Sequence, residues 1–132
     1  MVDRFNDKVK LLNTYFNNIT MQDAILKIDK MIAEKRKSYV VAVNVDVTVK
    51  MEDDSLLKEI ADNADLTLVD GQPLIWVSRL HKKPIVEKIS GSDLVPLILQ
   101  LASQKGYSVF LLGGKDGVAE KAKENIKLNY PE

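Results

Sequence analysis

Asp70 and Gly71 stand where an apolar run over residues 66–69 gives way to a helix-like pattern that starts with a proline. A carboxylate at the end of a strand can act as a general base and take a proton from a bound hydroxyl group. The same pair is also a common turn, in which Asp accepts backbone hydrogen bonds and Gly adopts a positive φ. Taken alone, the pair favours the turn, and the base is the alternative.

Three glycines, Gly113, Gly114 and Gly117, lie in the segment LLGGKDGVAEKA, between a strand-like run and a helix-like run. At such a junction, free backbone N–H groups and the helix dipole can hold a phosphate. The spacing matches neither GxGxxG nor the P-loop pattern. The loop alone is therefore equally consistent with a phosphate site and with a plain connection.

A further polar group lies in the segment EKISGSDL, which contains Lys88, Gly91, Ser92 and Asp93. Ser92 or Asp93 is expected to cap a helix, because both types accept hydrogen bonds from the first turn. Lys88, Ser92 and the first backbone amides could in addition bind a phosphate or a sugar together.

Asn44 and Asp46 occupy alternate positions of the β-branched run YVVAVNVDVTV. Alternate side chains of a strand point to the same face, so a strand here would put both polar groups together. On spacing alone, a solvated strand end is slightly favoured over a substrate contact.

The elements that would position these residues alternate along the chain. The hydrophobic periodicity and the cap residues predict strands over 9–16, 39–49, 66–69 and 108–112, and helices over 21–36, 54–63, 73–80, 92–105 and 118–129. We expect a capping box at Thr20–Asp23 and a left-handed Gly106 after the fourth helix. This alternation predicts a single α/β domain over 1–132, Rossmann-like, with a largely parallel sheet and flanking helices. In such sheets ligands bind beyond the carboxyl ends of the strands, where the polar groups above would gather.

Composition excludes several classes of function. The 19 basic and 19 acidic residues balance, which leaves no electrostatic footprint for a nucleic acid. No apolar run approaches the ~20 residues of a membrane span, and the first ten residues lack the apolar core of a signal peptide. The chain has no cysteine and a single histidine, His81, so we expect no thiolate chemistry and no histidine-rich metal site.

Three motifs occur in order: ADLTLVDGQPLIWVSRL, KPIVEKISGSDL and GYSVFLLGGKDGVAEKAKENIKLNYPE. Together they resemble the WecG/TagA/CpsF family of bacterial glycosyltransferases, over nearly the whole chain. The resemblance implies transfer of a sugar, often N-acetylmannosamine, from a UDP donor to an undecaprenyl-diphosphate-linked acceptor, for cell-surface polysaccharides. It also implies inversion at the anomeric carbon, no metal or other cofactor, and a cytoplasmic enzyme that can sit on the inner face of the plasma membrane.

The resemblance assigns the role of catalytic base to Asp70 and makes Asn44 a substrate contact. The remaining candidate substrate contacts are the polar and glycine residues of the same segments: Asp46, Gly71, Gln72, Lys88, Gly91, Ser92, Asp93, Gly113, Gly114 and Gly117. Without a metal, positive charge and backbone amides must receive the departing diphosphate.

The chain departs from the family pattern at two places. Lys88 stands where the family usually has Arg, which keeps the charge but loses the bidentate fork. The chain also stops at Tyr130-Pro131-Glu132, where family members continue, so we expect it to be truncated relative to them. A non-catalytic module that binds a nucleotide or nucleotide sugar is the alternative function, and self-association through an exposed sheet edge remains open.

Overall fold

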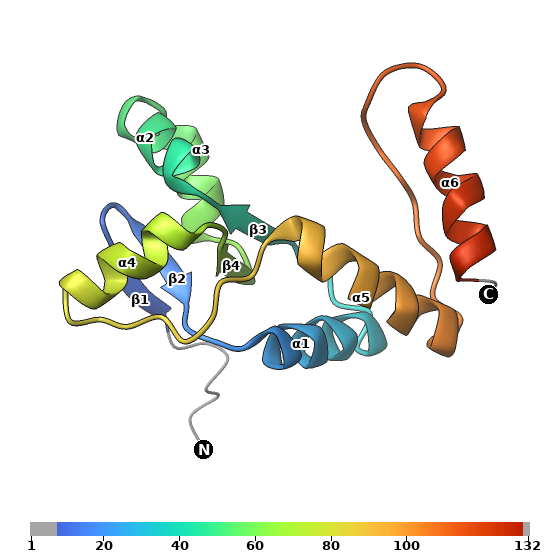
Figure 1. The fold of residues 1–132 in the computed structure, drawn as a ribbon, viewed down its shortest axis with the longest axis horizontal. Coiled ribbons are helices and arrows are strands. Elements are labelled where there is room, and N and C mark those ends of the chain that lie inside the picture. Colours follow the sequence, from blue (N-terminus) through green and yellow to red (C-terminus); the bar gives the residue numbers. More distant parts are fainter. Residues whose placement is uncertain (1–7, 131–132) are drawn as a thin grey trace. The chain divides into compact units, whose positions relative to one another are not determined.

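The computed structural model describes residues 8–130 and divides the chain into two compact units, Met1–Leu94 and Val95–Glu132 (Figure 1). Each unit is described by itself. The described part of the first unit contains four short strands and four helices, and it begins the fifth helix, α5 (Gly91–Lys105). The second contains the rest of α5, an extended segment and α6 (Val118–Asn129).

The first unit opens with a hairpin. Strands β1 (Lys8–Leu11) and β2 (Thr14–Asn17) pair antiparallel, with Lys8 opposite Asn17. The prediction of one strand over 9–16 was therefore wrong, because Leu12 adopts a positive φ of 58° and turns the chain. The amide of Asn13 fixes this turn by donating to the backbone oxygen of Thr48 at 2.8 Å. Apolar residues alone do not distinguish one strand from two that are joined by a two-residue turn.

The second sheet is a parallel pair. Strands β3 (Val40–Val43) and β4 (Leu66–Val69) run side by side, with Val40 opposite Leu66 and Val43 opposite Val69. All four residues of β4 are buried, as the continuous apolar run predicts for a strand covered on both faces. The described part of the chain is therefore mixed α/β with two small two-stranded sheets, and only one of them is parallel.

Four helices, α1 (Met21–Ala33), α2 (Val45–Asp53), α3 (Ser55–Asp62) and α4 (Gln72–Leu80), complete this unit. The apolar faces of α2, α3 and α4 meet the strands in one core. Its buried members are Leu11, Phe16, Val43, Met51, Ala61, Val69, Leu74, Ile75 and Ile85. The predicted capping box is confirmed, because the Thr20 side chain accepts from the backbone of Asp23 and the Asp23 side chain accepts from that of Thr20.

Helix α2 overturns the predicted strand over 39–49, which ends at Val43 instead. The side-chain oxygen of Asn44 accepts a hydrogen bond from the backbone N–H of Val47 at 2.9 Å, so Asn44 is the N-cap of a helix. The β-branched residues that follow have high strand propensity, but propensity is a weak preference that a cap and tertiary packing can override.

Helices α1 and α4 share an unusual ending. Lys35 follows α1 with φ of 53°, and the backbone N–H of Arg36 donates to the carbonyl of Met31 at 3.1 Å. Lys82 follows α4 with φ of 56°. This Schellman-type reversal usually employs glycine. It ends α1 at Ala33, three residues before the predicted position.

The second unit contains an extended segment where a strand was predicted over 108–112. Gly106 has φ of 69°, and Tyr107 donates its backbone N–H to Ala102 at 2.9 Å, so the predicted glycine ending of α5 is confirmed. No strand is assigned to residues 108–112, and Phe110 and Leu112 are 87% and 93% exposed. A strand needs a partner for its backbone groups, and the described part of this unit supplies none.

We predict that Asn17→Ala destabilises the first unit by about 1–3 kcal/mol, because it leaves a buried donor unpaired. Asn17 is buried, and its side-chain oxygen accepts from the backbone N–H of Thr67 at 2.8 Å, which ties the hairpin to β4. Urea denaturation monitored by circular dichroism measures the change. The control is Asn63→Ala, since Asn63 is exposed and its amide contacts only the last turn of α3. Equal effects of the two substitutions would contradict this role of Asn17.

Candidate functional site

Strands β3 and β4 lie side by side (Figure 1), and three of the predicted residues, Asn44, Asp70 and Gly71, follow their carboxyl ends. The backbone N–H of Asp70 donates to Val43 at 3.0 Å, which continues the parallel ladder by one residue. Asp70 is half-buried at this point. Gly71 has φ of 136°, and a Cβ placed there would lie 3.9 Å from the Cβ of Asn44. The sequence therefore positions Asn44 beside the Asp70–Gly71 turn, and the positive φ explains the glycine.

Residues 84–90 form an extended segment on the side of β4 that faces away from β3. The backbone N–H of Ile89 donates to the carbonyl of Val69 at 2.8 Å. Ile85 and Ile89 are buried and anchor the segment, whereas Lys88 is exposed. Because Ile89 bonds to the residue before Asp70, Lys88 and Ser90 are held next to the end of β4.

Three side chains that sequence reasoning missed hold this segment in place. Asn18 accepts from the backbone N–H of Val86 at 2.8 Å and donates to the carbonyl of Pro84 at 3.1 Å. Glu87 accepts from the backbone N–H of Met21 at 2.8 Å, at the positive end of α1.

Ser78 is the third of these side chains. Its buried hydroxyl accepts from the backbone N–H of Ile85 at 3.1 Å and donates to Ile75 at 2.6 Å. For Asn18 and Ser78 the sequence contains no signal, because their partners lie 66 to 68 and seven residues away. Glu87 adjoins Lys88 in the EKISGSDL motif, and that motif could have drawn attention to it.

The start of α5 differs from the prediction. Ser90, rather than Ser92 or Asp93, caps the helix: its hydroxyl oxygen accepts from the backbone N–H of Asp93 at 3.2 Å. The Ser90 hydroxyl also lies 3.2 Å from that of Ser92. Gly91, Ser92 and Asp93 form the first turn of α5, and the side chains of Ser92 and Asp93 are exposed.

The start of α4 follows Asp70 directly. Gly71 is the N-cap residue and provides no side-chain cap, and Pro73 stands in the first turn. Gln72 is exposed in the first turn of this helix. The first turn thus presents its positive end beside the Asp70 carboxylate without a capping side chain.

Asp46 does not share a strand face with Asn44, because both follow the end of β3. It lies in the first turn of α2 and forms an exposed ion pair with Lys50, with the two charged atoms 2.9 Å apart. The hydrogen bond from this ammonium to Asp46, aided by the charge of the carboxylate, raises the pKa of Lys50. Asp46 therefore pairs with a residue of its own helix.

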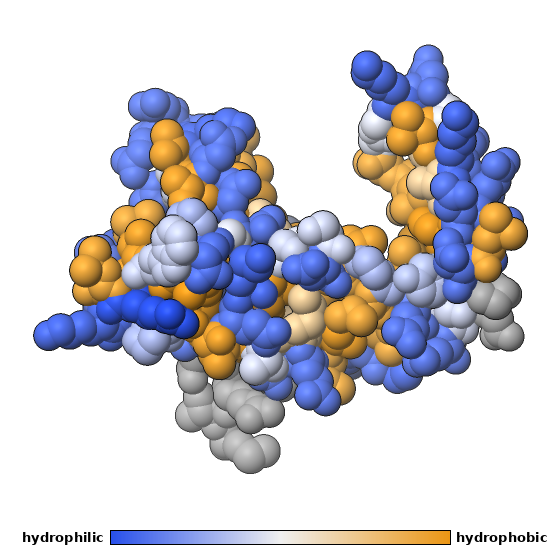
Figure 2. Space-filling view, in the orientation of Figure 1, coloured by the Kyte–Doolittle hydropathy of each residue, from blue (hydrophilic) through white to orange (hydrophobic). Residues whose placement is uncertain are grey.

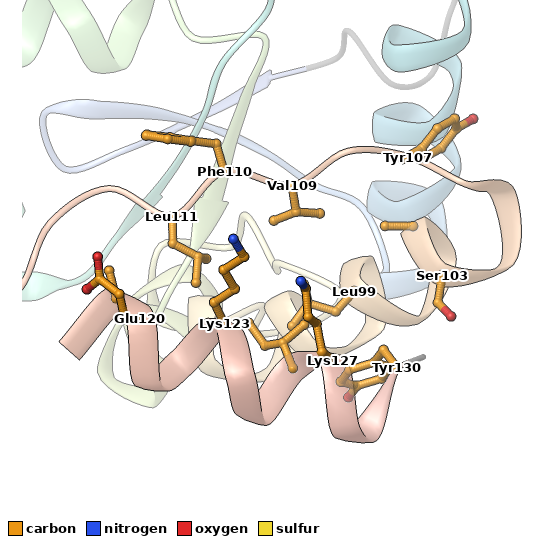
Figure 3. A pocket seen from close by; sticks show the side chains of 13 residues that line it. Leu99, Ser103, Tyr107, Val109, Phe110, Leu111, Glu120, Lys123, Lys127 and Tyr130 are labelled. Atoms are coloured by element: carbon orange, nitrogen blue, oxygen red, sulfur yellow. The ribbon is translucent and has the colours of Figure 1, made fainter. Parts of the chain in front are cut away.

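Gly113, Gly114 and Gly117 lie in the second unit and are described there. All three have positive φ, and Gly117 is the N-cap residue of α6. The same unit contains a hollow of about 620 Å³, lined by α5, the extended segment and α6 (Figure 3). Lys123, Lys127 and Glu120 add charged groups to its otherwise largely apolar lining. None of the site residues predicted from the sequence lines this hollow.

Among residues 8–130, no group of three or more His, Cys, Asp or Glu side chains is placed to hold a metal ion. Over the same residues, no helix combines the length and apolarity needed to span a bilayer.

We predict that Asn18→Ala increases hydrogen–deuterium exchange at the backbone N–H of Val86 by about tenfold, because the amide loses its acceptor and exchange follows local opening. Mass spectrometry or NMR of the amides measures this change. Exchange in β4 should stay unchanged. Asn63→Ala is again the control, and unaltered exchange at Val86 in Asn18→Ala would contradict the anchoring role.

Comparison with known proteins places this chain among glycosyl transferases. The family model described as "Glycosyl transferase WecG/TagA/CpsF family" matches residues 9–132. The chain is 26% identical over 126 residues to proteins of three Staphylococcus aureus strains, NCTC 8325 / PS 47, COL and MSSA476. Each of these proteins is named N-acetylglucosaminyldiphosphoundecaprenol N-acetyl-beta-D-mannosaminyltransferase.

The alignment covers 94% of this chain and 50% of each relative, so the chain spans about half the length of the curated relatives that it matches. The family model, by contrast, matches nearly every residue from the first strand onward. The junction of Asp70, Gly71 and Lys88 lies within this matched region. The chain therefore belongs to the WecG/TagA/CpsF family of glycosyl transferases.

Proposed function

We propose that the protein containing this chain is an inverting glycosyltransferase that moves an N-acetylmannosamine-like sugar from a UDP donor to a polyprenyl-diphosphate-linked sugar. The observation that carries the proposal is the position of Asp70. Its half-buried carboxylate stands at the carboxyl end of β4, beside Asn44 and the segment that bears Lys88. Family membership and the names of the Staphylococcus aureus relatives supply the class of reaction.

In this mechanism Asp70 acts as the general base. The acceptor hydroxyl oxygen attacks the anomeric carbon, a new C–O bond forms, and the bond from that carbon to the UDP oxygen breaks. The hydroxyl proton passes to the Asp70 carboxylate, and the diphosphate leaves with the electron pair. A single displacement of this kind inverts the anomeric carbon, and it needs one base on the acceptor side.

The departing diphosphate requires compensating positive charge, and we propose that no metal supplies it. Lys88 is the candidate cation. It lies near the end of β4, because the next residue, Ile89, donates its backbone N–H to Val69. The first turns of α4 and α5 add backbone N–H groups beside it. We propose that the glycine loop, Gly113 to Gly117, contributes further amide donors, and that Asn44 contacts the substrate.

We also propose that the enzyme works in the cytoplasm at the inner face of the plasma membrane. The Staphylococcus aureus relatives are named for an undecaprenol-linked substrate, and such a lipid stays in the bilayer. An enzyme that uses it must meet the membrane surface, whether or not it spans the membrane.

We predict that Asp70→Asn lowers the rate of sugar transfer by at least about 100-fold in the complete protein, because the amide cannot accept the proton. The dissociation constant for UDP should change less than about twofold, since the amide keeps the shape of the carboxyl group. Transfer of radiolabelled sugar to a short-chain prenyl-diphosphate acceptor measures the rate.

Asp53→Asn is the matched control, because Asp53 is exposed at the end of α2. Undiminished transfer by Asp70→Asn would remove this residue from the mechanism. A wild-type protein that binds UDP but transfers no sugar would instead support the non-catalytic nucleotide-binding module.

We predict that Lys88→Arg binds UDP about three- to tenfold more tightly, because a guanidinium contacts phosphate oxygens in a bidentate manner. Lys88→Ala should weaken binding by a similar factor. Isothermal titration calorimetry with UDP measures both, and Lys37→Arg, at another exposed lysine, is the control. Equal dissociation constants in all four proteins would show that Lys88 does not contact the diphosphate.

A further inference from the structure

Around the end of α4, exposed apolar side chains lie among basic ones. Trp76 and Leu80 are 62% and 80% exposed, and they are four residues apart, so they share one face of the helix. Figure 2 shows apolar and strongly hydrophilic atoms side by side around the end of this helix. A tryptophan that is left in water costs free energy unless another surface covers it.

The hairpin adds to the same surface. Lys10 and Leu12 line a small hollow together with His81 and Lys83, and the ammonium of Lys83 donates to the carbonyl of Lys10 at 3.4 Å. We call this region the basic apolar surface. Its members are Lys10, Leu12, Trp76, Arg79, Leu80, Lys82 and Lys83.

Charge on this surface has one sign, although the whole chain is neutral. No Asp or Glu occurs from Gly71 to Val86, or from Lys8 to Gln22. The structure ties one carboxylate to the hairpin turn: Glu52 accepts a hydrogen bond from Asn13 at 2.8 Å, and its single negative charge is outnumbered by Lys10, Arg79, Lys82 and Lys83. The cationic residues therefore retain a net positive field, which complements an anionic partner.

We propose that the basic apolar surface docks the protein on an anionic lipid bilayer. Trp76, Leu80 and Leu12 would enter the interface between headgroups and acyl chains, while the cations contact acidic headgroups. Tryptophan is typical of that interface, because its ring is apolar and its N–H is polar.

The position of this surface explains how a docked protein would reach its lipid-linked acceptor. This part of the inference rests on the proposed function. Helix α4 joins the surface to the Asp70–Gly71 turn and has nine residues, so its length is about 14 Å. A protein docked by the far end of α4 would hold the Asp70 carboxylate within about one length of this helix from the headgroups. An acceptor sugar on a lipid diphosphate would then reach the base without leaving the bilayer.

Vesicle flotation tests the proposal. The complete protein should bind vesicles of phosphatidylcholine with phosphatidylglycerol, bind much less to phosphatidylcholine alone, and dissociate as the salt concentration rises. Trp76→Ser/Leu80→Ser should lower vesicle affinity at least about tenfold. Lys82→Gln should lower it about fivefold, the usual effect of one basic residue near an anionic surface.

The chain provides close controls for both changes. Lys35→Gln removes an exposed lysine with the same left-handed conformation after another helix. Val49→Ser/Leu56→Ser replaces two apolar residues that are 61% and 63% exposed on α2 and α3. Both controls should keep wild-type affinity for vesicles, and circular dichroism checks that every variant is folded.

Three results would overturn the proposal: no binding to anionic vesicles, equal binding to neutral vesicles, or equal losses in the test and control variants. A change of native mass in Trp76→Ser/Leu80→Ser without a loss of vesicle binding would assign the surface to a second copy of the chain. Titration with UDP separates this test from the proposed function. A protein that binds UDP but not vesicles would contradict only the docking surface.

Discussion

The candidate site depends on the hydrogen bond from the backbone of Ile89 to that of Val69, 2.8 Å long. Together with the bond from Asp70 to Val43, it continues backbone pairing at the end of β4 on both sides. This bond sets the position of the segment that bears Lys88 along the end of β4, next to Asp70. Catalytic groups must be held closely to be effective, so this pairing matters more than the identity of any one surface residue.

The segment over residues 84–90 is extended and joins β4 through the bond from Ile89 to Val69, but it is not assigned as a strand. Its stability comes from side chains distant in the sequence, namely Asn18, Ser78 and the buried isoleucines. Glu87 gives it a further link to the positive end of α1. The EKISGSDL motif thus combines two physical tasks. Glu87 and Ile89 hold the backbone, and Lys88 between them is left exposed, as the proposed contact with the diphosphate requires.

The sequence predicts elements whose signals are local. The bounds of β4 and α6 agree with the predicted ranges, because an unbroken buried run defines the first and a glycine N-cap the start of the second. The position of Asp70 after β4 follows from the same run. The capping box at Thr20 and the glycine ending at Gly106 are likewise short-range patterns, and both were predicted correctly.

Features that depend on tertiary contacts were not predictable in the same way. Val45 to Val49 has strand propensity, yet the side chain of Asn44 starts a helix there and separates Asp46 from the site. Residues 108–112 have the composition of a strand, but pairing depends on a neighbour and not on composition. The anchoring role of Asn18 could not be predicted from the sequence, because its partners Pro84 and Val86 lie far along the chain.

We propose that one carboxylate at the end of β4 serves a single displacement. The most direct measurement is the anomeric configuration of the product, determined by NMR from the carbon–hydrogen coupling at the transferred sugar. A single base at Asp70 predicts the configuration opposite to that of the UDP donor. Retention of the donor configuration would contradict a single displacement, because it requires either two successive displacements or attack from the face that the diphosphate leaves.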